Sequence, residues 1–343
     1  MRLLFISQIV IAIQIAAAQS PRPDATPSIV YVAHNPAAIK SYKTDPAVVR
    51  AMVNRLVTAV TNQPDVAAAW NSLVSPKDRI GIKISATGGE IFTTHRDIVN
   101  AIVDGLAAAG HARNSIVVWD RSLGGASEAG YKAEAYRLVS IAPRDGYDAK
   151  VVVSAPVLGK LIWGDYEYVG RTMLPLSDTE NTSSVSHFAR VLTTDVTKII
   201  NLPVMSDSET TGIAGCIYNM TVPNLDNWRR FTQSTRFGGS SLAEIYGDPM
   251  IAKKVVLNMM DGLIAEYAGG PEAHPNFQLH HASIYASRDP VAIDALALKK
   301  IEEWRQHASL PLLTERAVHV EAAAQLGLGN ASAERIEVRN VSP

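Results

Sequence analysis

The sequence has little of what marks several common classes of protein. It holds one cysteine, Cys216, in 343 residues. A lone thiol excludes an internal disulfide, and the lack of a CxxC pair excludes a cysteine-held iron–sulfur cluster or zinc site. The formal net charge of -1 leaves no basic excess for nucleic acid. Rossmann and P-loop spacings, fixed-period repeats and low-complexity segments are also missing.

The N-terminus has the composition of an export signal. One basic residue, Arg2, precedes a mostly apolar run over residues 3–15, and Ala16-Ala17-Ala18 offers a small-residue cleavage site. This pattern predicts a signal peptide over residues 1–18, with a short membrane anchor as the alternative. The apolar run is too short and interrupted for a stable span. Residues 19–27 then read as a disordered lead-in. We expect export to a bacterial periplasm or the medium.

The rest of the chain alternates between two periodicities. Apolar runs predict strands at residues 28–33, 79–84, 116–119, 150–154, 197–203, 283–287 and 335–338. Helical spacing predicts helices after Asp45-Pro46 and over residues 66–73, 98–110, 249–267, 290–305 and 314–326. Strands that alternate with helices predict an α/β fold, with a mostly parallel sheet flanked by helices.

The sequence changes character in its middle third. Residues 161–169 alternate around a Gly-Asp pair and predict a hairpin, and residues 178–186 predict a polar loop or lid. We therefore expect a first α/β lobe over residues 28–155. A second lobe with an insertion follows over residues 156–343, and its C-terminal elements are expected to complete the same core.

Residues 79–121 form the most informative unit, because they predict strand, polar loop, helix and strand in that order. The first strand carries Lys83, its loop carries Gly88 and Gly89, and the second strand ends in Asp120-Arg121. Open parallel sheets bind ligands beyond the carboxyl ends of their strands. The sequence therefore predicts a ligand site at this edge.

Each candidate residue in this unit has two readings. A buried Lys83 needs an anion, which is either a substrate or a carboxylate such as Asp120. Gly88 and Gly89 could present backbone amides to an anionic group, or simply form a turn. His95 at the start of the helix is a candidate acid–base group, ligand or ordinary capping residue.

Charged residues elsewhere also have both a functional and a structural interpretation. Arg121 could hold a carboxylate or phosphate, or pair with Asp120 in the fold. Asp294 sits in a helix that is apolar nearly all round, so it is expected to be buried. It either faces the cleft as a base or ligand, or fastens a neighbouring loop. Asp289, directly before Pro290, is expected to cap that helix.

The polar segment around residues 205–236 contains candidate oxygen ligands for a hard divalent cation. Asp207, Glu209 and Asn219 are residue types that Mg²⁺ or Ca²⁺ prefers, although no EF-hand spacing occurs. His280-His281 precede a predicted strand, where adjacent side chains point to opposite faces, so a shared metal is disfavoured.

Five motifs follow one another along the chain: Gly81-Ile82-Lys83, Trp119-Asp120-Arg121, Lys198–Pro203, Ser287–Asp294 and Leu326–Gly329. This ordered set resembles a bacterial and archaeal family, domain of unknown function 362. The resemblance implies an α/β fold and no particular activity. It carries over to Lys83, Asp120, Arg121, Asn219, Asp289 and Asp294. Family members tend to have Lys and His after the Asn-Leu-Pro strand and Lys before the later Asn, where this chain has Ser206, Ser208 and Tyr218.

Three functions remain open from these residues. The first is a non-redox enzyme that acts on an anionic or polyhydroxylated small molecule, with Lys83, Arg121, Gly88, Gly89 and Asn219 binding it. Asp120, Asp294 and His95 would then be the catalytic candidates. The second is a binding protein for a solute or metal, and the third is a degenerate homologue whose site is structural.

Overall fold

The structure is a computed structural model that describes residues 26–142, 145–154, 185–232 and 238–342. The predicted signal peptide, most of the predicted lead-in and the hairpin predicted over residues 161–169 lie outside the described residues. The polar loop predicted over residues 178–186 also lies outside them, apart from its last two residues, which begin a strand.

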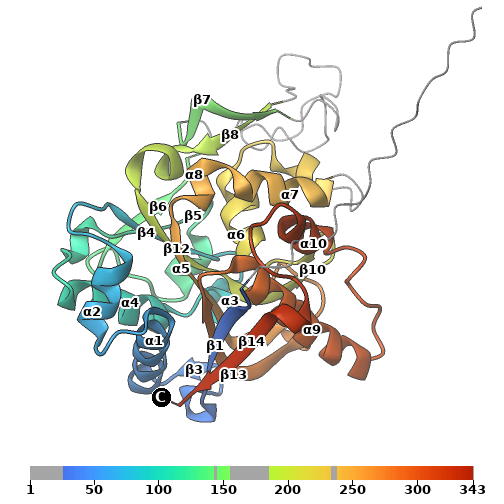
Figure 1. Ribbon diagram of the computed structural model, residues 1–343, viewed down its shortest axis with the longest axis horizontal. Helices are drawn as coiled ribbons and strands as arrows, with labels where there is room; N and C mark the ends of the chain where they lie inside the picture. Colours follow the sequence, from blue (N-terminus) through green and yellow to red (C-terminus); the bar gives the residue numbers. More distant parts are fainter. Residues whose placement is uncertain (1–25, 143–144, 155–184, 233–237, 343) are drawn as a thin grey trace, which may run out of the picture.

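A ten-stranded, mostly parallel sheet forms the centre of the molecule (Figure 1). Only β13 runs antiparallel to both of its neighbours along the main path, β1 and β12. The order along this path is β14 (Ile336–Val341), β1 (Ser28–His34), β13 (Gln278–Ser287), β12 (Val255–Glu266), β9 (Lys198–Leu202), β4 (Ile80–Ile84), β5 (Val117–Asp120) and β6 (Arg137–Ser140). Two further strands branch from it, β10 (Val204–Ser208) beside β12 and β11 (Gly212–Ile213) beside β10. Strands from both sides of residue 155 therefore belong to one sheet.

Helices cover both faces of this sheet, which confirms the predicted α/β class (Figure 1). Apolar side chains divide into two buried clusters, one on each face. One face carries α1 (Pro46–Thr61), α2 (Val66–Leu73) and α4 (Arg96–Ala108). The other carries α6 (Cys216–Thr221), α7 (Gly238–Gly247), α9 (Pro290–His307) and α10 (Val318–Gln325). Three short helices are α3 (Gly89–Phe92), α5 (Gly124–Glu128) and α8 (Pro249–Ala252), and two small sheets are formed by β2 (Ile39–Lys40) with β3 (Lys43–Thr44) and by β7 (Tyr147–Ser154) with β8 (Val185–Ala189).

Local sequence explains where the longest helices begin. Asp45 and Asp289 each precede a proline and accept hydrogen bonds from backbone amides of α1 and α9. An aspartate cap satisfies amides that lack partners in the first turn, and proline at the first helical position needs no such partner. The predicted capping role of Asp289 is confirmed, and the same carboxylate also accepts from Asn330 N at 2.8 Å.

Four predictions along the chain differ from the structure. Residues 249–267 do not form one long helix, because only Pro249–Ala252 is helical and Val255–Glu266 is strand β12. The helix predicted over residues 314–326 begins at Val318. His280 and His281 lie inside β13 and do not precede it. The strand predicted at residues 150–154 belongs to β7, which pairs with β8 outside the central sheet, and Val152 is exposed there.

The parallel register aligns β4, which carries Lys83, with its two neighbouring strands. Lys83 on β4 is paired with Trp119 on β5 and with Asn201 on β9. The carboxyl ends of these three strands therefore lie side by side, and the segments that follow them leave the sheet at one edge.

Candidate functional site

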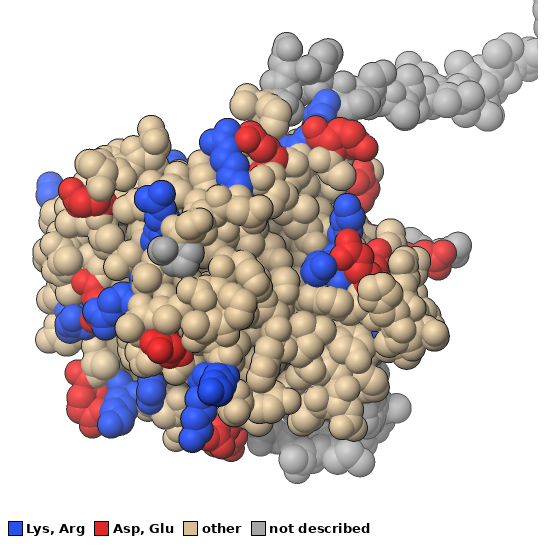
Figure 2. Space-filling model, turned by 90° about the horizontal axis from the view of Figure 1, so that it is seen from below, with Lys and Arg blue, Asp and Glu red and all other residues tan. Residues whose placement is uncertain are grey.

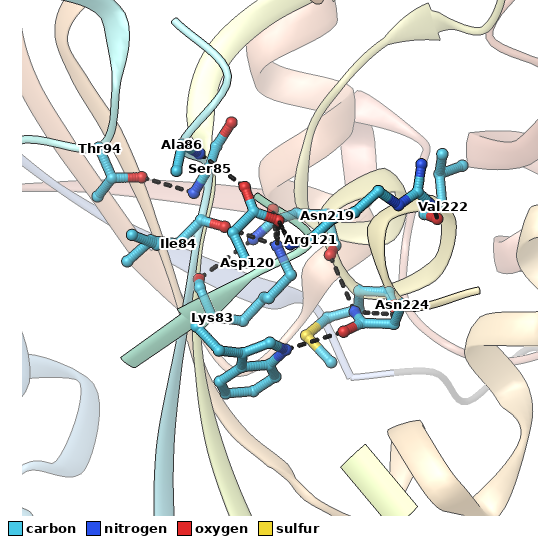
Figure 3. A network of polar contacts seen from close by, with 12 residues as sticks. Lys83, Ile84, Ser85, Ala86, Thr94, Asp120, Arg121, Asn219, Val222 and Asn224 are labelled. Atoms are coloured by element: carbon cyan, nitrogen blue, oxygen red, sulfur yellow. Dashed lines mark hydrogen bonds and ion pairs between the residues drawn. The ribbon is translucent and has the colours of Figure 1, made fainter. Parts of the chain in front are cut away.

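Lys83 and Asp120 form a buried ion pair at the ends of β4 and β5 (Figure 3). The Lys83 Nζ atom lies 2.7 Å from Asp120 Oδ1 and donates to the Ile84 carbonyl at 2.6 Å. Burial lowers the pKa of Lys83, and the Asp120 carboxylate opposes this effect. The second Asp120 oxygen accepts from Ala86 N at 2.7 Å. The salt bridge expected as the structural alternative is therefore present, and both charges are compensated inside the fold.

Asparagine side chains continue this pair across the sheet. Asn219 on α6 accepts from Lys83 Nζ at 3.0 Å and donates to Asn201 Oδ1 on β9 at 2.9 Å. Asn201 in turn donates to Asn258 Oδ1 on β12 at 2.9 Å and to the Cys216 carbonyl at 2.9 Å. The network ties three neighbouring strands to α6, and all of its side chains are buried. Asn219 thus contacts Lys83 directly, and these contacts satisfy hydrogen-bonding groups of both side chains.

Arg121 stands apart from the ion pair although it follows Asp120 directly. Only its backbone amide contacts the Asp120 carboxylate, at 2.7 Å. Its Nη2 atom donates to the carbonyls of Val222 and Leu225, and its guanidinium lies 4.8 Å from the Trp228 ring centroid. The Arg121 Nε atom is buried without a hydrogen-bond partner. Among the described residues no carboxylate neutralises this partly buried cation, so it is the basic group of this edge with capacity for an anion.

His95 is held by Asp261, a residue that the sequence did not single out. Its backbone amide and its Nδ1 atom both lie 2.7 Å from Asp261 Oδ2, which is fully buried in β12. His95 Nε2 is buried without a partner. The neighbouring Thr94 fixes this segment by donating to the Leu202 carbonyl and accepting from Ser85 N. The histidine is therefore oriented at the carboxyl ends of β4 and β9, on the side of the sheet that α4 covers.

The glycine loop after β4 is shaped by close packing. Gly89 has a φ of 63°, the left-handed region that favours glycine, and begins α3. The backbone at Gly88 packs tightly against α3, because an added Cβ would lie 2.2 Å from the Phe92 carbonyl oxygen. The Ala86 amide in the same loop is used by Asp120. These contacts agree with the turn reading of Gly88-Gly89, and the anion-binding role stays a prediction.

Asp294 fastens a neighbouring segment, as one of its two readings required. Its oxygens accept from the backbone amides of Cys216 at 2.6 Å and Ile217 at 3.0 Å, at the first turn of α6. Burial raises the pKa of Asp294 to about 7, against the lowering effect of these two amides. The same helix carries Asn219, so Asp294 positions the asparagine that meets Lys83.

The oxygen ligands proposed for a cation are not gathered at one point. Asp207 and Glu209 lie 3.5 Å from Arg305 Nη1, and Glu209 also pairs with Arg316 at 2.6 Å. Asn219 belongs to the Lys83 network instead. Within the described ranges, no three His, Cys, Asp or Glu side chains come together as a possible metal site.

Charged side chains of both signs are distributed over the surface. Figure 2 shows acidic and basic side chains interspersed over the face that it presents, with no patch of a single sign. No helix in the described part of the chain is long and apolar enough to cross a membrane.

Fold and site together define a three-layer α/β protein whose strand ends are joined by a buried polar network. The sequence profile of the family called domain of unknown function (DUF362) matches residues 80–299, more than half of the chain. The chain belongs to this family. No curated protein matches it. A crystal structure of a Thermotoga maritima protein is similar at a TM-score of 0.41 and 9% identity, over 84% of this chain and 60% of that one. This chain thus spans about three fifths of that protein's length.

Proposed function

We propose that the protein is an exported, non-redox enzyme that acts on an anionic small molecule at the carboxyl edge of the central sheet. One observation carries the proposal. The Arg121 guanidinium is partly buried at that edge, no described carboxylate neutralises it, and its Nη1 atom has no hydrogen bond to a described residue. An arginine that is held in place on carbonyls and has donors to spare suits a carboxylate or phosphate.

Other candidate residues support this site from within the fold. Lys83 and Asp120 neutralise each other, and Asp294 holds the first turn of α6. Their hydrogen-bonding capacity is largely used by these contacts, so we assign them to the framework that positions Arg121 and the loops around it. Gly88, Gly89 and His95 line the loop after β4 and complete the proposed edge.

Export rests on the sequence. Residues 1–18 contain a basic residue, an apolar run and an alanine site, which together support cleavage after Ala18. Expression of the full-length gene product in a bacterium, followed by mass determination of the protein recovered from the periplasm, tests this. A mass that still includes residues 1–18 would contradict cleavage.

Arg121→Gln tests the anion site. Purified protein is titrated with inorganic phosphate and with succinate by calorimetry, and is incubated with a polar metabolite extract whose composition is followed by mass spectrometry. We expect anion binding and turnover to weaken at least tenfold in Arg121→Gln. They should be unchanged in Arg50→Gln, whose side chain lies on α1 and pairs with Asp104. Equal binding by Arg121→Gln and the unaltered protein would overturn the proposal.

A second candidate is a solute-binding protein without catalysis, and a third is a degenerate homologue whose site is only structural. The saturated network around Lys83 favours both, because a group that is fully paired in the fold is poorly placed for chemistry. The extract experiment separates the enzyme from the binding protein. Binding that depends on Arg121, with no compound consumed, would favour the binding protein.

A further inference from the structure

A second histidine–carboxylate pair lies beside Arg121 and involves neither Lys83 nor Asp120. The backbone amide of His187 on β8 donates to Asp226 Oδ1 at 2.5 Å, and its ring Nδ1 lies 2.7 Å from Asp226 Oδ2. Asp226 N donates back to the His187 carbonyl at 3.2 Å. Three hydrogen bonds between two residues fix both the position and the plane of the imidazole.

This arrangement determines which ring nitrogen is available. Because a carboxylate only accepts, Nδ1 carries the proton and Nε2 is left as the basic nitrogen of the neutral ring. The His187 side chain is 22% exposed while that of Asp226 is 2% exposed. Since Nδ1 faces Asp226, the exposed part includes the opposite side of the ring, and no described residue bonds Nε2. Burial raises the pKa of Asp226, and its bonds to His187 oppose this.

Arg121 and His187 are hydrogen-bonded to two consecutive residues, Leu225 and Asp226. Arg121 Nη2 donates to the Leu225 carbonyl at 2.7 Å, and His187 is bonded to Asp226, the next residue. Leu225 also forms a bridge with Phe188, the residue after His187. The end of β5, the Leu225–Asp226 segment and β8 are thus locked together. Arg121 and the His187–Asp226 pair are therefore held by two neighbouring residues of one segment.

We infer that His187 is the acid–base residue for the anionic ligand of Arg121, and that Asp226 is its positioning residue. This inference rests on the proposed function. In the transfer, the O–H bond of a water or substrate hydroxyl breaks, its electron pair stays on oxygen, and a new N–H bond forms at Nε2. The Nδ1 proton stays on the ring and remains donated to Asp226, whose charge stabilises the imidazolium.

His95 provides the internal comparison. It is bonded to Asp261 by the same two groups, its backbone amide and its Nδ1 atom. Its side chain is 10% exposed and its Nε2 atom is buried. Of the two oriented histidines, His187 is therefore the one whose basic nitrogen can exchange protons with solvent or ligand.

Nitrogen NMR of histidine-labelled protein tests the inference in two stages. In the first, no ligand is present. We expect His187 at pH 8 to be the tautomer with its proton on Nδ1, and Asp226→Asn to shift the tautomer ratio. A wild-type His187 with its proton on Nε2 would overturn the inference without affecting the proposed function.

The second stage adds inorganic phosphate. We expect the His187 ring signals to move on titration, the movement to vanish in Arg121→Gln, and His280, exposed on β13, to stay unchanged. If phosphate binding needs Arg121 but the His187 ring signals do not shift, the inference about His187 is wrong and the proposed function stands. Phosphate binding that survives in Arg121→Gln would remove the proposed function. For any compound consumed from the extract, His187→Gln should lower kcat about 100-fold or more with little change in KM, while His280→Gln should not.

Discussion

Lys83 Nζ and Asp120 Oδ1 lie 2.7 Å apart, and their side chains are only 0% and 3% exposed. Removing one member of a buried ion pair leaves the other charge without its partner, which typically costs about 3–5 kcal/mol. We therefore expect Lys83→Met to lower the free energy of unfolding by about that amount. The Lys83→Met, Asp120→Leu double variant should lose less than the sum of the two single variants. Urea unfolding followed by circular dichroism measures both quantities.

The chain contains a matched surface pair for this experiment. Lys300 and Glu303 are 2.9 Å apart on α9, and both side chains are well exposed. Exposed pairs contribute about 0–1 kcal/mol, so Lys300→Met should change the free energy of unfolding by less than about 1 kcal/mol. Equal losses at the two sites would mean that the Lys83 pair is not sealed from solvent.

Asp294 should make the protein less stable as the pH rises toward neutrality. Its pKa in the fold is about 7, above the ordinary 3.8, so between these values the folded state holds a proton that the unfolded state has released. The contribution of this group to the free energy of unfolding is then present at low pH and is lost as the pH rises from about 4 to about 7. Asp294→Asn should flatten that slope. Unfolding in urea at pH 5 and pH 8 tests it, and Asp45→Asn at the exposed cap of α1 serves as the control.

The buried side chains of Glu266 and Gln278 have too few hydrogen-bond donors for their acceptor oxygens. Gln278 Nε2 donates to Glu266 Oε2 at 2.9 Å, while Glu266 Oε1 and Gln278 Oε1 are both buried acceptors without donors. Burial raises the pKa of Glu266 to about 7. Because the folded pKa is the higher one, the stability from this carboxyl is present at low pH and is lost as the pH rises from about 4.5 to about 7.

Glu266→Gln supplies a permanent N–H at this position. We expect it to raise the midpoint of thermal unfolding at pH 8.5 relative to the unaltered protein and to have less effect at pH 6. Gln278→Glu should do the opposite, because it places two carboxyl groups together. A lower midpoint for Glu266→Gln at pH 8.5 would show that Glu266 is stable there as a carboxylate.

Two neighbouring glycines at the start of α5 should respond differently to alanine. A Cβ on Gly125 would lie 2.3 Å from the Ala86 carbonyl oxygen and 2.6 Å from Thr93 Oγ1. A Cβ on Gly124 would meet nothing closer than Ser122 Oγ at 3.8 Å. We expect Gly125→Ala to destabilise the protein by about 1–3 kcal/mol through displacement of the loop after β4. Gly124→Ala should be neutral or slightly stabilising, since alanine is the better helix former. Thermal unfolding of the pair decides.

The one large error in the predicted fold shows how a central strand can imitate a helix. Ile251, Val255, Met259 and Leu263 recur every four residues, which fits one face of a helix. Four is also a multiple of two, so the same residues fit one face of a strand. β12 has neighbouring strands on both sides and helices on both faces of the sheet, so nearly all its positions are buried and an alternation of exposed polar residues is missing. Spacing alone could not separate these cases, although Val255-Val256 favours a strand.

The candidate site was predictable where chemistry is visible in one segment. A lysine inside an apolar strand requires an anion wherever the chain goes, and the next parallel strand ends in Asp120, so their meeting followed from βαβ order. His95 meets Asp261 across 166 residues and His187 meets Asp226 across 39. No local pattern marks these acids as partners. They become visible only when β12 and the Leu225–Asp226 segment are placed in three dimensions.

Cys216 begins α6 beneath Asp294 and has no exposed surface. Burial, together with the nearby carboxylate, raises the pKa of its thiol well above the ordinary value, so the reactive thiolate is suppressed. A maleimide or disulfide reagent should therefore modify this protein only when the helix detaches from α9. The rate of labelling at this single thiol would then report how often the centre of the molecule opens, with no engineered probe.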